Sequence, residues 1–96
     1  MKHNVYFDGK VQSLGVNTEE GYATVGVITP GKYSFSNDYE EHVIIITGTL
    51  KVKLPGEGWK TVKRNETYVV PSKSLFEVEA GADVAYICYY KGRRAE

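Results

Sequence analysis

The sequence predicts an all-β protein whose strands close into a sandwich or a barrel. Ten glycines and three prolines divide the 96 residues at short intervals. The segments between them are rich in Val, Ile, Thr and Tyr, which favour strands. No window of ten or more residues carries apolar residues at helical spacing together with helix caps. We therefore expect little or no helix and about eight to ten short strands.

The expected strands are separated by turn residues. The first two flank Asp8-Gly9-Lys10, the third ends at Pro30-Gly31, and Gly48-Thr49 marks a hairpin. Between the turns, apolar and polar residues tend to alternate, which is typical of strands with one buried face. The expected strands are Val5–Phe7, Val11–Val16, Ala23–Thr29, Lys32–Ser36, Val43–Thr47, Leu50–Leu54, Trp59–Lys63, Thr67–Val70, Leu75–Glu79 and Val84–Tyr90.

Length and composition exclude several classes of protein. We expect one domain over residues 1–96, with a charged tail from about residue 91 that contains Arg93 and Arg94. Twelve Lys+Arg balance twelve Asp+Glu, so a nucleic-acid-binding module is not expected. The longest apolar run, Val84–Tyr90, is far shorter than the ~20 residues that span a bilayer, so no membrane partner is expected. Cys88 is the only cysteine, which excludes an internal disulfide and favours a reducing, cytoplasmic setting.

Two spacings resemble the motifs of cupins. Glu41 is followed by six residues and then Gly48, which matches the end of the first cupin motif. Asn65 stands six residues before Pro71, at the place of the glycine of the second motif. The chain therefore looks like a cupin, a small jelly-roll barrel also called a double-stranded β-helix. The resemblance implies an active site at the mouth of this barrel.

The residues that hold a metal ion in cupins are largely missing. Ser34 and Ser36 stand where two histidines are expected, and Phe76 stands where a third is expected. Hydroxyls and a phenyl ring are not ligands for iron, manganese or zinc. Glu41 and a displaced His42 cannot hold a divalent ion firmly. We therefore predict a metal-free cupin without a cofactor, which argues against dioxygenase or metal-isomerase chemistry.

A longer set of motifs, in a fixed order along the chain, narrows the resemblance from cupins in general to one family of them. It begins at Tyr6–Gly15, which resembles the opening Y-F-x-G-K-V-x-S-x-G. It continues with Val25–Val27, Gly31–Ser36, Glu40–Glu41, Gly48–Leu50, Leu54–Pro55, Trp59, Val70–Pro71, Phe76 and Tyr86–Cys88. From Tyr6 to about Tyr90 the chain resembles the pyrimidine/purine nucleoside phosphorylase family of short cupins. Tyr89 is a departure, because some members carry arginine after the cysteine.

The resemblance implies phosphorolysis, in which a nucleoside and inorganic phosphate give a free base and a pentose 1-phosphate. It also implies a homodimer. Breaking an N-glycosidic bond passes through an oxocarbenium-like sugar. Such a site needs a cradle for phosphate, contacts to the ribose hydroxyls and a pocket for the base.

Glu41 and Ser36 are the catalytic candidates. Glu41 can stabilise positive charge on the sugar or, if burial raises its pKa, protonate the base; a structural role at the mouth of the sheet is the alternative. Ser36 and Ser34 are two apart on a strand and share a face, which the cupin analogy places in the barrel interior. Their hydroxyls can then hold phosphate or ribose, or the two serines can be a small polar pair on an exposed strand face. Tyr33 and Phe35 are expected on the opposite face.

The remaining candidates bind substrate. Phe76 can stack on a base without reading its edge, or it can simply belong to the core. Lys73 and Arg64 can supply positive charge for phosphate, or they can be ordinary solvated charges. We expect most of the eight tyrosines to be sheet and interface residues. Two other functions remain open: a non-catalytic cupin that binds a small ligand or sugar, and a metal cupin with unusual ligands.

Overall fold

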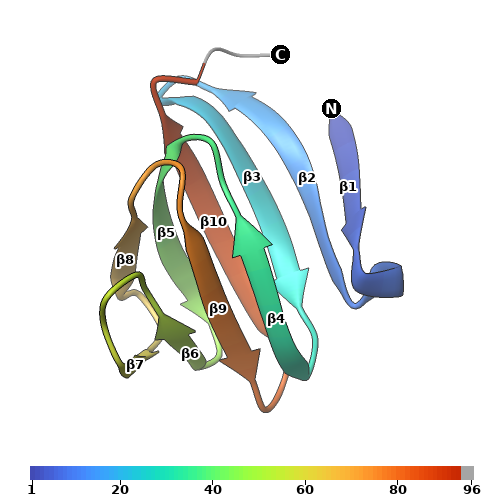
Figure 1. Cartoon of the computed structure of the whole chain (residues 1–96). Helices are drawn as coiled ribbons and strands as arrows, with labels where there is room; N and C mark the ends of the chain where they lie inside the picture. The colour runs from blue at the N-terminus through green and yellow to red at the C-terminus, as the bar shows by residue number, and fades with distance from the viewer. Residues whose placement is uncertain (94–96) are drawn as a thin grey trace.

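The computed structural model describes residues 1–93 and consists of two antiparallel sheets (Figure 1). The larger sheet has the strand order β1-β2-β3-β10-β5-β8, and the smaller has β4-β9-β6-β7. One short 3-10 turn, η1, spans Phe7–Gly9, and no helix in the described residues is long and apolar enough to cross a membrane. The strands are β1 Lys2–Tyr6, β2 Val11–Thr18, β3 Gly21–Ile28, β4 Gly31–Ser36, β5 Glu40–Thr47, β6 Leu50–Lys53, β7 Trp59–Val62, β8 Thr67–Val70, β9 Leu75–Ala80 and β10 Val84–Lys91.

The predicted all-β class is confirmed, and alternation along the strands places the core between the two sheets. In β6, Leu50 and Val52 are fully buried, whereas Lys51 and Lys53 are exposed. This is the pattern expected of a strand with one face on the core. In Figure 1 the smaller sheet lies in front of β5 and β10, and the buried residues of both sheets meet between them.

The C-terminal strand β10 lies in the middle of the larger sheet. It pairs antiparallel with β3 on one side and with β5 on the other, with Cys88 opposite Thr24 and Val43. Since side chains alternate along a strand, Tyr86, Cys88 and Tyr90 share the face that lines the interior. The position of β10 therefore brings residues from both halves of the sequence to one interior surface.

The predicted phase of β4 is wrong for Tyr33, Ser34 and Phe35. Tyr33 is only 5% exposed and Phe35 packs against the core, whereas Ser34 lies exposed on the other face. Burying two aromatic rings is more favourable than burying two small hydroxyls. The Tyr33 hydroxyl also finds partners, since it is within 3.0 Å of the carbonyl oxygens of Thr29 and Pro30. The spacing of the cupin motif therefore identifies the strand, but it places Ser34 on the wrong face of that strand.

Residues 91–93, which the sequence prediction assigned to a charged tail, belong to the described structure. Lys91 is the last residue of β10, Gly92 forms a turn, and Arg93 lies against the interior. The positions 94–96, including Arg94, lie outside the described residues.

Gly26 on β3 is required by the close approach of Tyr86 from β10. These two residues are paired across the strands. A Cβ atom at Gly26 would lie 2.6 Å from the Tyr86 hydroxyl oxygen and 2.7 Å from the backbone carbonyl oxygen of Gln12. The carbonyl is held by the sheet, so it cannot move aside as the end of a flexible side chain can. Glycine at this position allows the Tyr86 ring to lie flat across the sheet.

We expect Gly26→Ala to lower the free energy of unfolding by about 1–3 kcal/mol, because the added methyl group overpacks the sheet. Urea unfolding followed by tyrosine fluorescence measures the change. Gly81→Ala is the matched control, since nothing lies within 4 Å of a Cβ atom there and its φ is not positive. Equal stability of the two variants would contradict the assigned packing of Tyr86 on Gly26.

Candidate functional site

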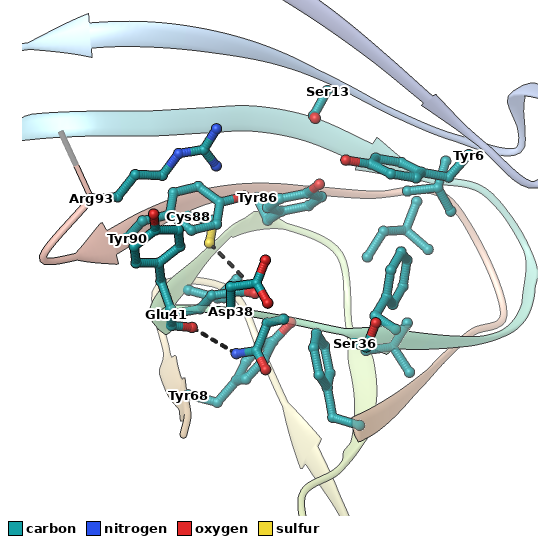
Figure 2. Close-up of a pocket in the computed structure, with 18 of the residues that line it drawn as sticks. Tyr6, Ser13, Ser36, Asp38, Glu41, Tyr68, Tyr86, Cys88, Tyr90 and Arg93 are labelled. Atoms are coloured by element: carbon teal, nitrogen blue, oxygen red, sulfur yellow. Dashed lines mark hydrogen bonds between the residues drawn. The ribbon is translucent and has the colours of Figure 1, made fainter. Parts of the chain in front are cut away.

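A cavity of about 760 Å³ lies between the two sheets. This volume is within the usual range for small-molecule sites. Figure 2 shows Arg93, Tyr90 and Glu41 on one side of the cavity and Tyr6 and Ser36 on the other. The lining residues are Tyr6, Val11, Ser13, Ile28, Phe35, Ser36, Asn37, Asp38, Tyr39, Glu41, Val43, Tyr68, Phe76, Val78, Tyr86, Cys88, Tyr90, Gly92 and Arg93.

Glu41 lies on β5 and points into the cavity. Its strand pairs with β10 so that Glu41 is opposite Tyr90 and Val43 is opposite Cys88. The Cys88 thiol donates a hydrogen bond to Glu41 Oε1, with a distance of 3.4 Å between the sulfur and the oxygen. The β5–β10 register therefore sets the carboxyl group beside a buried thiol.

Burial raises the pKa of the Glu41 carboxyl above its ordinary value, because the charged form loses contact with water. Hydrogen bonding by the Cys88 thiol and the Asn37 amide lowers this pKa in part, since both favour the carboxylate. A carboxyl group in such a site can hold a proton at higher pH than a surface glutamate. It can also act as a strong electrostatic partner for a cation, because little water screens it.

Neutral hydroxyl and thiol groups surround this carboxyl. Burial raises the pKa of the Tyr68, Tyr86 and Tyr90 phenols and of the Cys88 thiol, and the nearby Glu41 charge contributes in the same direction. These groups are therefore protonated at neutral pH and serve as hydrogen-bonding groups. The Tyr90 hydroxyl already lies 3.1 Å from the Thr24 hydroxyl. A raised thiol pKa also makes Cys88 a poor nucleophile.

Seven of the eight tyrosines lie on strands, as expected of sheet residues, but several of them also line the cavity, which was not expected from the sequence. Five of the eight tyrosines line it. Alternation along β10 could have predicted part of this result, because it places Tyr86, Cys88 and Tyr90 on one face of the strand. The five lining tyrosines are Tyr6, Tyr39, Tyr68, Tyr86 and Tyr90.

Aromatic rings form the wall on the Tyr6 side of the cavity. Phe35 and Phe76 are stacked, with ring centroids 5.6 Å apart and an interplanar angle of 25°. Tyr6 meets Phe35 edge to face at 6.0 Å. Phe76 is 7% exposed, so it belongs both to the core and to the cavity wall. A flat ring system can pack against such a wall without specific hydrogen bonds.

Asn37 fixes the loop between β4 and β5 that carries two further lining residues, Asp38 and Tyr39. Its side-chain amide donates to the carbonyl oxygens of Tyr39 at 2.7 Å and Pro71 at 2.9 Å. Its amide oxygen accepts from the backbone N–H of Ser74 at 2.9 Å. The loop is thereby tied to the turn that joins β8 to β9.

Arg93 is a lining residue that the sequence prediction assigned to the charged tail. Its guanidinium carbon lies 4.4 Å from the ring centroid of Tyr22 and 5.1 Å from that of Tyr90. Of the cavity-lining residues in the described part of the chain, Arg93 is the only lysine or arginine. No sequence motif marks it, because its position depends on the turn that follows β10.

The structure brings three of the six predicted site residues to the cavity: Glu41, Ser36 and Phe76. The other three do not line it. Ser34 lies on the outer face of β4, Arg64 lies in the turn between β7 and β8, and Lys73 lies in the turn between β8 and β9. All three are exposed. Tyr89, at the position where some relatives were expected to carry arginine, also does not line the cavity.

No group of three or more His, Cys, Asp or Glu side chains that could hold a metal ion occurs within residues 1–93. Ser34, Ser36 and Phe76 stand at the expected cupin ligand positions, and none offers a carboxylate, imidazole or thiolate. The prediction of a metal-free site stays a prediction.

Comparisons with known proteins agree with this architecture. Residues 1–90 match the family described as pyrimidine/purine nucleoside phosphorylase. A pyrimidine/purine nucleoside phosphorylase of Pseudomonas putida is 42% identical over 89 residues, which cover 92% of this chain and 95% of the relative. A solved Vibrio parahaemolyticus protein of unknown function is 39% identical with a TM-score of 0.87, covering 91% of this chain and 94% of that one.

A more distant solved structure shows the fold. A cupin-like protein of Thermotoga maritima has a TM-score of 0.68 at 16% identity, covering 81% of this chain and 65% of that one. The predicted cupin fold is confirmed.

We expect Glu41→Gln to raise the free energy of unfolding at neutral pH, because glutamine keeps the shape but removes a partly buried, desolvated charge. Between the ordinary pKa of glutamate and the raised one, the folded protein holds a proton that the unfolded chain has lost. Wild-type stability therefore falls as the pH rises through this window, by about 1.4 kcal/mol for each pKa unit. Urea unfolding at neutral pH and near pH ~4, where the protonated form dominates in both states, measures the difference.

Glu57→Gln is the matched control, since Glu57 is exposed in the turn after β6. A stability gain of Glu41→Gln that is the same at both pH values, or that also appears in Glu57→Gln, would contradict the assigned cause.

Proposed function

Since the chain belongs to the pyrimidine/purine nucleoside phosphorylase family, we propose that it cleaves purine and pyrimidine nucleosides with inorganic phosphate. The products are a free base and a pentose 1-phosphate, so the enzyme is a pentosyltransferase. The observation that best supports this proposal is the partly buried Glu41 carboxyl, which lines an aromatic cavity large enough for a nucleoside. We propose that the reaction needs no metal ion.

In the proposed reaction, the bond between C1′ of the sugar and the base nitrogen breaks, and its electron pair passes to the base. A phosphate oxygen forms the new bond to C1′. One proton of dihydrogen phosphate passes to the base nitrogen, which balances the charges. Positive charge develops on the sugar during this exchange.

Glu41 acts on the sugar as a carboxylate. Cys88 donates a hydrogen bond to it, which favours the ionised form, and the surrounding phenols are neutral. The carboxylate can accept hydrogen bonds from ribose hydroxyls and stabilise the positive charge of the transition state. Little water competes in this site, so the electrostatic stabilisation is large.

The other groups of the cavity bind the rest of the substrates. The stacked rings of Phe35 and Phe76 provide a flat surface for purine and pyrimidine bases alike, which supports broad base preference. Arg93 supplies positive charge for phosphate, and the Ser36 hydroxyl is a further polar contact. We assign no substrate contact to Ser34, Lys73 or Arg64, because they do not line the cavity.

We further propose that the protein is a homodimer in the cytoplasm. Apolar side chains are exposed on the outer face of the larger sheet, where a second copy can cover them. Leu14 pairs with Val25 across β2 and β3, and Val25 pairs with Ile87 across β3 and β10. Leu14 and Val25 are 42% and 40% exposed, so this face carries a contiguous apolar stripe.

Incubation of the purified protein with uridine, adenosine or inosine should release free base only when phosphate is present. Chromatography of the reaction detects the base and the pentose 1-phosphate. We expect Glu41→Gln to lower kcat about 100-fold, as loss of a transition-state charge contact does. Glu57→Gln should keep wild-type activity. Ligand-dependent thermal stabilisation without turnover over the whole panel would instead support a non-catalytic binding protein.

The pH profile of kcat should separate the two roles of Glu41. If the carboxylate stabilises the sugar, kcat falls as the pH drops through the raised pKa of Glu41, and this acid limb disappears in Glu41→Gln. Steady-state rates in buffers of constant ionic strength measure the profile. A limb on which kcat falls as the pH rises, and which Glu41→Gln removes, would show that Glu41 protonates the base.

A further inference from the structure

Arg93 reaches the cavity because the chain turns back immediately after β10. Gly92 adopts a φ of +80°, which is a left-handed conformation that favours glycine. The backbone N–H of Arg93 then donates to the carbonyl oxygen of Tyr90 at 3.4 Å. This tight turn places both Gly92 and Arg93 in the cavity wall.

Three tyrosine rings from three different elements surround the Arg93 guanidinium. Its central carbon lies 4.4 Å from the ring centroid of Tyr22, 5.1 Å from Tyr90 and 5.8 Å from Tyr39. Tyr22 belongs to β3, Tyr39 to the loop between β4 and β5, and Tyr90 to β10. We call these three residues the tyrosine collar.

Two members of the tyrosine collar pack against each other, and all three are held in place by their surroundings. The Tyr22 and Tyr90 rings are 5.8 Å apart and inclined by 37°. Tyr22 is only 4% exposed, and the Tyr90 hydroxyl is held at 3.1 Å from Thr24. Two walls of the collar therefore belong to the rigid sheet, and the loop that carries Tyr39 is tied down by Asn37.

The cavity is unfavourable for an anion in one respect, and a fixed arginine compensates for it. Glu41 and Asp38 both line the cavity, so an entering phosphate meets carboxyl groups as well as a cation. An arginine side chain that moves freely loses much rotamer entropy when it binds. A cation–π contact holds the guanidinium through the ring face and itself uses none of the N–H donors.

We propose that the tyrosine collar positions Arg93 to bind inorganic phosphate, and that Tyr22 is a positioning residue for this step. Tyr22 makes the shortest of the three ring contacts with Arg93 but does not itself line the cavity. It therefore acts on phosphate only through Arg93. This proposal rests on the proposed phosphorylase function, because phosphate is the second substrate of that reaction.

Steady-state kinetics with saturating uridine and varied phosphate tests the proposal. Tyr22→Leu removes the aromatic face and should raise KM for phosphate about 10-fold, while KM for uridine stays within about twofold of wild type. Tyr22→Phe keeps the ring and should restore the wild-type value. Tyr89→Leu is the matched control, because Tyr89 is next to Tyr90 on β10 but does not line the cavity.

A second pair of variants keeps the test decisive if Tyr22→Leu fails to fold. Tyr39 is 41% exposed, so Tyr39→Leu disturbs the core little and should raise KM for phosphate a few-fold. Arg93→Lys keeps the charge but loses the planar group, and should also raise KM for phosphate. An unchanged KM for phosphate in both variants, or an equal rise in KM for uridine and phosphate in Tyr22→Leu, would overturn the proposal.

A binding measurement separates this proposal from the function on which it rests. If the wild type releases no base, the phosphorylase function fails, and thermal unfolding with increasing inorganic phosphate then tests the collar alone. A phosphate-dependent rise in Tm that is smaller in Tyr39→Leu and Arg93→Lys than in the wild type supports the anion site. No rise in the wild type, or an equal rise in these variants, overturns it.

Discussion

The candidate site depends on one arrangement of hydrogen-bonded strands, the insertion of β10 between β3 and β5. Through this pairing Cys88 faces Val43 and Thr24 at once, and Tyr90 comes opposite Glu41. The turn after β10 then returns Arg93 to the same interior surface. The acid, the thiol and the phenols of Tyr68, Tyr86 and Tyr90 are therefore held by a single sheet, so their relative positions are set by strand register, and the cation is placed by the turn that follows β10.

The strand arrangement fixes the position of the Glu41 carboxyl but disfavours its negative charge. Burial disfavours the ionised form of Glu41, yet the Cys88 thiol donates to that form at 3.4 Å. The carboxyl is thus in contact with a thiol that does not neutralise it, and the nearby phenols of Tyr68, Tyr86 and Tyr90 remain protonated. A chain selected for stability alone would carry a neutral side chain at this position. The retained acid is consistent with a role in chemistry.

How much the sequence could predict differs from residue to residue. The strands and turns were predictable because glycine and proline mark them, and Glu41 was predictable from its spacing to Gly48. The orientation of β4 was not, since Tyr33 and Ser34 alternate equally well in either phase and only packing against the second sheet decides between them. The place of Arg93 in the cavity wall was not predictable for another reason. Its place depends on a left-handed Gly92 and on rings more than 50 residues away, such as Tyr39 and Tyr22.

The central place of a strand that comes late in the sequence has a consequence for how the protein is made. Before β10 has emerged from the ribosome, β3 and β5 each present an open edge with unpaired backbone groups. The apolar residues that β10 later covers then face water. Such an intermediate can pair with another nascent chain as readily as with its own missing strand. Docking of β10 between β3 and β5 closes both edges and removes this route to aggregation.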